Sequence, residues 1–217
     1  MVTKPSRGDI NWDVSLNAAL DDLQAQATST SSSVSSLATT VATNGGFPRP
    51  ANHGAVAWTA DPATVNGGQV ATNGTVALSA LYVTQSVTAT KLFWGITTAG
   101  ATPTAGQNFV GLYDANGNRL ATVNVDARIS SANTTFQETI NVSVSPGMYW
   151  AAWVFNAATP PTVFRGPNIN AGLVNFNLPV TAARYATGAT GQTALPAAIS
   201  PSANAFAQNS FWAAIAN

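Results

Sequence analysis

A row of mainly apolar residues with alternating four- and three-residue steps constrains the fold of this chain more than any other feature. We call this row the seam; it consists of Leu16, Leu20, Leu23, Ala27, Thr30, Val34, Leu37 and Val41. The spacing places all eight side chains on one side of an α-helix, at the a and d positions of a heptad repeat. We therefore expect a helix from Val14 to about Thr43, capped by Asp13, that associates with other helices as a coiled coil.

The middle of the seam is its weakest part, because Thr30 lies between Ser29 and a run of three serines at 31–33. A flexible Ser/Thr linker is the alternative interpretation of this composition. The register is the same on both sides of the serine run, and a linker has no reason to keep it. Leu, Val and Ala at these positions do not determine how many helices associate. We expect three helices to associate.

The rest of the chain is typical of an antiparallel β fold. Asn44-Gly45-Gly46 ends the helix, and residues 44–55 are expected to form a Gly/Pro linker. Beyond it, short apolar runs alternate with turn clusters over residues 56–217, which predicts a jelly-roll-like β-sandwich head. Asp114-Ala115-Asn116-Gly117 is expected to join two strands as a hairpin. The expected strands are Val56–Thr59, Thr75–Val83, Lys91–Thr97, Asn108–Tyr113, Arg119–Val125, Phe136–Val144, Met148–Phe155, Thr162–Phe164 and Phe211–Ile215.

The alternation of residues within the strands predicts which faces are buried. Phe136–Val144 has one apolar and one polar face, so it is expected to be half buried. Glu138 shares the apolar face, which indicates a pair with Arg119 or Arg128, an edge position, or a buried functional acid. Met148–Phe155 is aromatic or apolar on both faces. We expect its second face to be covered by a loop or by a neighbouring subunit.

Few residue types in this chain are suited to catalysis or metal binding. Cysteine is absent, and the single histidine, His53, lies in the linker with no nucleophile motif elsewhere. No phosphate-binding or dinucleotide-binding motif occurs. We expect no catalytic residue, cofactor or metal, and therefore no enzyme. Polysaccharide hydrolysis stays open as an alternative, because a glycosidase needs only two carboxyl groups. The acids of the head are Asp61, Asp114, Asp126 and Glu138.

Sugar binding is a stronger candidate for the head than hydrolysis. Aromatic faces combined with amide and hydroxyl side chains suit neutral polyhydroxyl ligands, and the head is rich in both. The alternative is that its tryptophans belong to the core, which is the usual position of tryptophan in strands. The sequence does not indicate which of them is exposed: Trp58, Trp94, Trp150, Trp153 or Trp212.

Charge and terminal sequence restrict the partners. Charged residues make up only 7% of the chain and the net charge is zero, so no electrostatic field attracts nucleic acid. The first residues lack the apolar stretch of a secretory signal, and no segment is long and apolar enough to span a membrane. We expect a protein that is made in the cytoplasm and works outside the cell; a secreted protein whose signal has been removed is the alternative.

Two stretches carry a resemblance to a known family. Residues 5–20, PSRGDINWDVSLNAAL, and residues 92–114, LFWGITTAGATPTAGQNFVGLYD, resemble minor tail proteins of phages that infect actinobacteria. Those proteins commonly begin with a Gly-Asp-x-Asn-Trp run and an Asn-Ala-Ala helix. The resemblance implies a virion component without enzymatic activity. It also implies that Asp9, Asn11 and Trp12 dock the chain on the particle.

Together these features predict a homotrimeric phage fibre or minor tail protein in the virion. Residues 1–15 would dock to other virion proteins, residues 16–43 would form a coiled-coil stalk, and the head would contact the host surface, with a cell-surface glycan as its candidate partner. A capsid-mounted head fibre or decoration protein is one alternative. A polysaccharide-degrading tail enzyme is the other.

Overall fold

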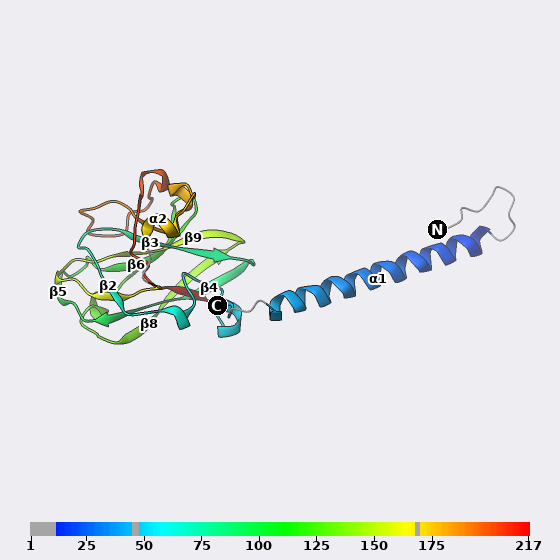
Figure 1. The fold of residues 1–217 in the computed structure, drawn as a ribbon, viewed down its shortest axis with the longest axis horizontal. Coiled ribbons are helices and arrows are strands. Elements are labelled where there is room, and N and C mark those ends of the chain that lie inside the picture. The colour runs from blue at the N-terminus through cyan, green and yellow to red at the C-terminus, as the bar shows by residue number, and fades with distance from the viewer. Residues whose placement is uncertain (1–11, 45–47, 168–169) are drawn as a thin grey trace. The chain divides into compact units, whose positions relative to one another are not determined.

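A computed structural model describes residues 12–44, 48–167 and 170–217 of the chain, which divides into two compact units, Met1–Pro48 and Arg49–Asn217. The described part of the first unit is almost entirely one helix, α1 (Trp12–Asn44) (Figure 1). The predicted helix is therefore confirmed, and it ends at the predicted Asn-Gly-Gly sequence. The predicted cap at Asp13 is wrong, because this residue already has helical backbone, whereas a capping residue does not.

Helix α1 continues through the serine run, where a flexible linker was the alternative. Several hydroxyl groups on the helix donate to the carbonyl four residues earlier. Thr28 Oγ1 donates to Gln24 O at 2.9 Å. Ser35 Oγ donates to Ser31 O and Thr39 Oγ1 to Ser35 O, each at 3.0 Å. These bonds keep the hydroxyl groups paired while the helical backbone stays intact, which lets a Ser/Thr-rich segment be helical.

The second unit, which we call the head, is built from two six-stranded antiparallel sheets (Figure 1). Sheet A runs in the order β1 (Ala57–Trp58), β14 (Ala214–Ala216), β4 (Val87–Thr98), β11 (Thr162–Phe164) and β2 (Gly68–Val70), with β8 (Thr134–Val144) also paired to β4. Sheet B runs in the order β13 (Ala205–Phe206), β12 (Tyr185–Thr187), β3 (Ala77–Val83), β9 (Gly147–Val154), β6 (Phe109–Asp114) and β7 (Arg119–Asn124). A separate pair joins β5 (Ala101–Pro103) to β10 (Ala157–Thr159).

Short helices occur in the connections of the head. They are η1 (Pro50–His53), η2 (Pro62–Thr64), η3 (Asp126–Arg128), α2 (Ala171–Val174), η4 (Val180–Ala182) and η5 (Pro201–Ala203). The composition assigns residues 50–53 to the linker, but in the structure they form η1 within the head unit. Within the described residues, no helix is both long and apolar enough to cross a membrane.

The main core lies between the two sheets. Alternate residues of β4, such as Trp94 and Ile96, belong to the same buried cluster as Leu112 and Trp153 of sheet B. The ring of Trp94 lies 5.8 Å from that of Phe155, which directly follows β9. Burying these large side chains removes most apolar surface of both sheets from water, which is the main force that holds them together.

Strand β9 in the middle of sheet B is buried on both faces over most of its length, as its sequence pattern predicts. Trp150 points away from the main core into a second cluster that contains Leu195, from a later segment of the chain. Tyr113 Oη donates to Pro196 O at 2.7 Å and ties this segment to the sheet. Burial raises the pKa of Tyr113 to about 12, so the phenol stays protonated as a donor, although Arg119 acts in the opposite direction. A loop of the same chain therefore provides the cover.

Candidate functional site: the helical seam and an aromatic pocket

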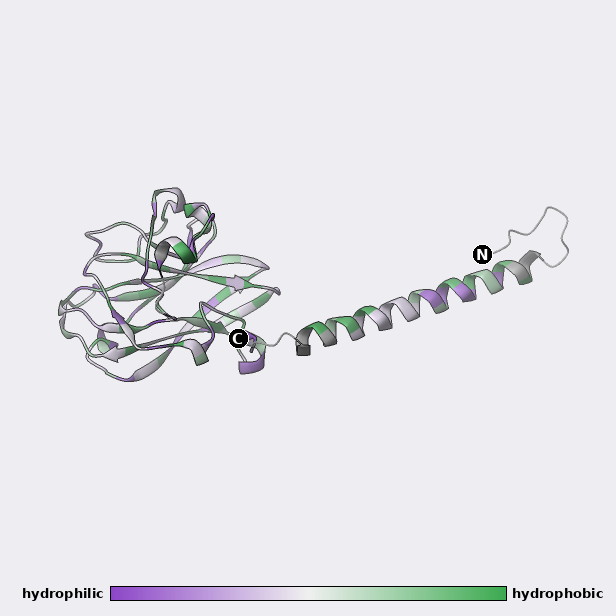
Figure 2. Cartoon of the chain, in the orientation of Figure 1, coloured by the Kyte–Doolittle hydropathy of each residue, from purple (hydrophilic) through white to green (hydrophobic). Residues whose placement is uncertain are grey.

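The seam forms an exposed row along α1. Its Leu and Val side chains are exposed by between 44% (Leu16) and 63% (Leu37), and Ala27 and Thr30 are exposed as well. Figure 2 shows that apolar residues recur along the helix, between polar ones. Single exposed apolar residues are ordinary on a protein surface, but a row that follows most of a helix indicates a surface that binds a partner.

Most of the docking residues inferred from the resemblance lie outside the residues that the structure describes. Asp9 and Asn11 lie outside the described residues, and Trp12 is described only as the first residue of α1. Their proposed role in docking therefore stays a prediction.

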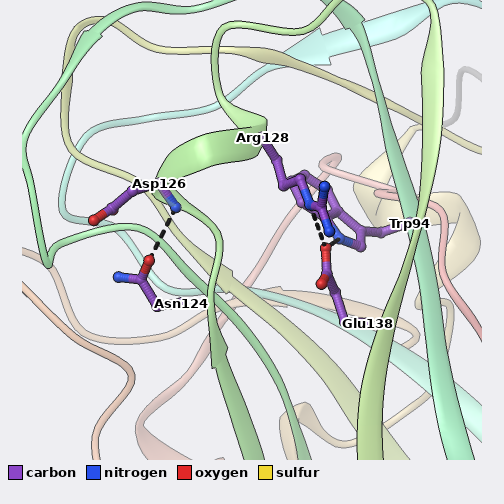
Figure 3. A network of polar contacts seen from close by, with 5 residues as sticks. All are labelled: Trp94, Asn124, Asp126, Arg128 and Glu138. Atoms are coloured by element: carbon purple, nitrogen blue, oxygen red, sulfur yellow. Dashed lines mark hydrogen bonds and ion pairs between the residues drawn. The ribbon is translucent and has the colours of Figure 1, made fainter.

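Glu138 is a buried carboxylate with two donors (Figure 3). Its Oε1 accepts a hydrogen bond from Trp94 Nε1 at 3.3 Å and from Arg128 Nε at 3.2 Å. Arg128 is thus the ion-pair partner, whereas Arg119, the other predicted candidate, donates to Leu195 O. These contacts explain why a charged residue can share the buried face of β8.

Two other acids of the head stabilise turns. Asp61 Oδ1 accepts from Ala63 N at 2.9 Å and caps η2. Asp114 begins the predicted hairpin between β6 and β7 and accepts from both the backbone and the side chain of Asn118, each at 2.8 Å. Burial raises the pKa of Asp114, but the hydrogen bonds from Asn118 and the turn backbone outweigh it, so the pKa lies below its ordinary value.

Asp126 connects η3 to the loop before β6. Its carboxylate accepts from Gly106 N at 2.6 Å and from Asn108 Nδ2 at 2.9 Å. Its own backbone N–H donates to Asn124 Oδ1 at 3.2 Å (Figure 3). Burial raises the pKa of Asp126, but hydrogen bonds from Gly106 and Asn108 outweigh this effect and lower the pKa overall. Each acid of the head therefore has a structural partner.

The tryptophans of the head fall into two groups. Trp94, Trp150 and Trp153 are buried in the core clusters, with at most 1% exposed. Trp58 and Trp212 are only half buried. The structure thus distinguishes the two tryptophans that can contact a ligand from the three that serve packing.

These two tryptophans line a pocket of about 260 Å³ on the outer face of sheet A. Strand pairing places Trp58 opposite Ala214, Ala214 opposite Phe93, and Phe93 opposite Gln137. The four residues therefore form a row across β1, β14, β4 and β8. Because Ala214 is small and stands between two aromatic residues, the side chains leave a depression on the outer face of the sheet at this point.

Polar groups surround the aromatic residues of this pocket. Gln137 is exposed, and its amide makes no hydrogen bond to any described residue. Trp58 Nε1 also makes no hydrogen bond to any described residue. Lys91 Nζ donates to Asn217 O at 3.0 Å. The His53 ring lies 5.5 Å from that of Trp58. We call the group of these side chains the aromatic pocket: His53, Trp58, Lys91, Phe93, Gln137 and Trp212.

A second, apolar hollow of about 140 Å³ adjoins the aromatic pocket. Trp212 and Pro62 line both hollows. The ring of Phe164 can lie across β4 in this hollow only because residue 95 is glycine; a Cβ there would lie 2.7 Å from Phe164 Cδ2. Trp212 Nε1 donates to Ala60 O at 3.0 Å, which fixes its indole between the two hollows.

Sequence reasoning missed the aromatic pocket although a signal for it exists. Phe93 alternates with the buried residues of its strand, and Trp212 has the same parity as Ala214. This alternation places both rings on the outer face of a sheet. The pairing that brings Trp58 beside them joins residues far apart in sequence, and no local pattern predicts it.

Within the part of the chain that the structure describes, no group of three or more His, Cys, Asp or Glu side chains could hold a metal ion. The sequence matches no protein-family model and no curated protein. Its function is therefore inferred from the seam, the pocket and the residues that form them.

Proposed function

We propose that this chain is a structural protein of a phage virion, a homotrimeric fibre or minor tail protein whose head contacts the host surface. Residues 1–15 would dock to other virion proteins, residues 16–43 would form a coiled-coil stalk, and a jelly-roll-like head would follow residues 44–55. The resemblance of residues 5–20 and 92–114 to minor tail proteins of actinobacterial phages supports this assignment.

The exposed seam is the observation that carries the proposal. Alone in water, a helix of this length with many Ser and Thr residues is marginal, because poor helix formers and costly nucleation oppose it. Seam residues such as Leu23 and Leu37 are more than half exposed on the single chain. Burying one such side chain contributes about 1.5–3 kcal/mol. Association of copies through the seam supplies the stability that a lone helix lacks.

A trimer also suits a head that binds its target weakly. Three copies on one stalk, and many stalks on one particle, raise the overall avidity without any additional contact. In such a protein, the binding site on each head needs only a low affinity for its target.

Immunogold labelling of purified particles of the phage that encodes this chain tests the proposal. Gold-labelled antibody against the head should decorate the tail or its tip in electron micrographs. Label on the capsid would instead favour the head-fibre or decoration alternative. Particles that carry no label, with the antibody shown to bind the isolated protein, would overturn the proposal.

A further inference from the structure

We propose that the aromatic pocket is a saccharide-binding site that takes one pyranose ring of a glycan. The inference rests on the proposed function only for the source of that glycan, the host surface. The site itself is argued from the residues that line it.

The shape of the pocket fits a sugar ring. A pyranose presents a face of C–H groups and a rim of hydroxyl groups. The C–H face can pack on the half-buried rings of Trp58 or Trp212, while the small side chain of Ala214, between Trp58 and Phe93, leaves room for the sugar ring. Binding sites for small molecules combine such apolar walls with a few placed polar groups, and this pocket has both.

The polar groups of the pocket match the hydroxyl groups of a sugar. Each hydroxyl can donate and accept a hydrogen bond. The Gln137 amide offers both functions, and Trp58 Nε1 offers a donor; neither group bonds to any described residue. Lys91 uses one donor on Asn217 O and has two more. A purely apolar partner would leave these groups unpaired at a cost, so a polyhydroxyl ligand suits them better.

The pocket is preorganised for binding. Trp58, Phe93 and Gln137 stand on paired strands, and their register fixes the spacing of the side chains. The hydrogen bond from Trp212 Nε1 to Ala60 O holds the remaining ring in place. Rigid walls reduce the entropy lost on binding, which matters for a weak ligand.

The pocket is built to bind a sugar without cleaving it. Its described lining residues include no Asp or Glu. Glycoside hydrolysis generally requires two carboxyl groups on either side of the scissile bond. A sugar bound in this pocket is therefore released without being cleaved.

The experiment is isothermal titration of the full chain with tetrasaccharides of glucose, galactose, mannose, N-acetylglucosamine and galacturonic acid. We expect at least one of them to bind at millimolar concentration. Trp58→Ala should weaken that binding by at least about tenfold, and Gln137→Ala by about three- to tenfold, the value of a lost hydrogen bond. The matched controls are Asn141→Ala, on the same face of β8, and Tyr82→Ala, an exposed aromatic residue on β3; both should bind like the original chain.

Two results would overturn the proposal: no tetrasaccharide binds, or both pocket variants bind as tightly as the controls. Gln137 is exposed and has no bonding partner among the described residues, so its variant keeps the test decisive if Trp58→Ala does not fold. Co-sedimentation with purified host wall glycan then shows whether the ligand belongs to the host surface. Sugar binding by a protein absent from the particle would refute the proposed function alone. A labelled particle whose protein binds no sugar would refute this inference alone.

Discussion

Glu138 shows how a single residue can follow the strand pattern and still be charged. It lies on the buried face of β8 with 6% of its surface exposed. Its carboxylate is tolerated there because Trp94 Nε1 and Arg128 Nε both donate to it. The bond to Trp94 is the more important of the two, since the indole is fully buried, whereas the Arg128 side chain is 45% exposed and partly solvated.

Two substitutions of Glu138 separate these contacts. Glu138→Ala removes both and leaves Trp94 Nε1 buried without a partner, which should lower the free energy of unfolding by about 1–3 kcal/mol. Glu138→Gln keeps an oxygen that can accept from Trp94 and should cost less, about 1 kcal/mol or below. Urea unfolding measures both, with Thr139→Ala on the exposed face of β8 as control. Equal losses in the two Glu138 variants would contradict the importance of the indole bond.

Asp114 and Asp126 make the stability of the head depend on pH. Hydrogen bonds hold the pKa of both carboxyl groups below the ordinary value in the folded head. The unfolded chain therefore binds more protons in acid, and the stabilisation, complete above the unfolded pKa, is lost as the pH falls through the folded pKa. The Tm should therefore decline as the pH is lowered below about 5.

Asp126→Asn should lower the Tm at neutral pH and make that decline in acid shallower. Calorimetry at a series of pH values measures the effect, with Asp22→Asn on the exposed surface of α1 as the control. A variant whose Tm declines in acid as steeply as that of the original chain would show that Asp126 does not contribute.

Helix α1 has a sequence that favours its own structure only weakly. Its seam is continuous except at Thr30, where a polar side chain occupies a d position. Thr28, Ser35 and Thr39 bond back to the helix backbone, so these hydroxyl groups are satisfied within α1. The middle of the helix is therefore where added apolar surface should matter most.

Thr30→Leu should strengthen self-association, because each chain buries an additional apolar side chain worth about 1.5–3 kcal/mol. The matched control is Ser32→Leu, which adds the same side chain at an exposed position outside the seam. The measurements are the association constant from sedimentation equilibrium and the helix content from circular dichroism. An equal gain from Ser32→Leu would mean that association does not depend on the heptad register.

The sequence predicts the long elements of this fold and the bounds of one short strand, β11 (Thr162–Phe164), but it misses several other short strands. Strand β8 has clear alternation over its length, and the hairpin at Asp114 has an unambiguous turn sequence. Strands β2, β12 and β13 have only two or three residues each. Such short strands have no period of their own and form because pairing with distant residues fixes them.

Of the two candidate sites, the sequence predicts the seam but not the aromatic pocket. The seam is visible in the sequence because all of its residues lie within one helix. The aromatic pocket is not, because Trp58 and Phe93 are brought together through β14, which lies more than a hundred residues further along the chain. Contacts over such separations depend on the order of the strands in the sheet, which local patterns do not specify.

At the scale of the whole molecule, the chain combines two units with different sources of stability. The head has large buried clusters of its own. The described seam side chains of α1 are exposed on the single chain, and in the proposed trimer other copies would cover them. Deleting residues 14–43 should therefore leave a folded head that is monomeric or weakly associated.

Sedimentation equilibrium of the full chain beside this deletion distinguishes assembly through the seam from assembly through the head. We expect the full chain to have three times its monomer mass of 22.2 kDa, and the deleted chain to have the mass of one head or to associate only weakly. A full chain that stays monomeric at high micromolar concentration would contradict the account. So would a deletion that is still fully trimeric, because the head and not the seam would then determine the assembly.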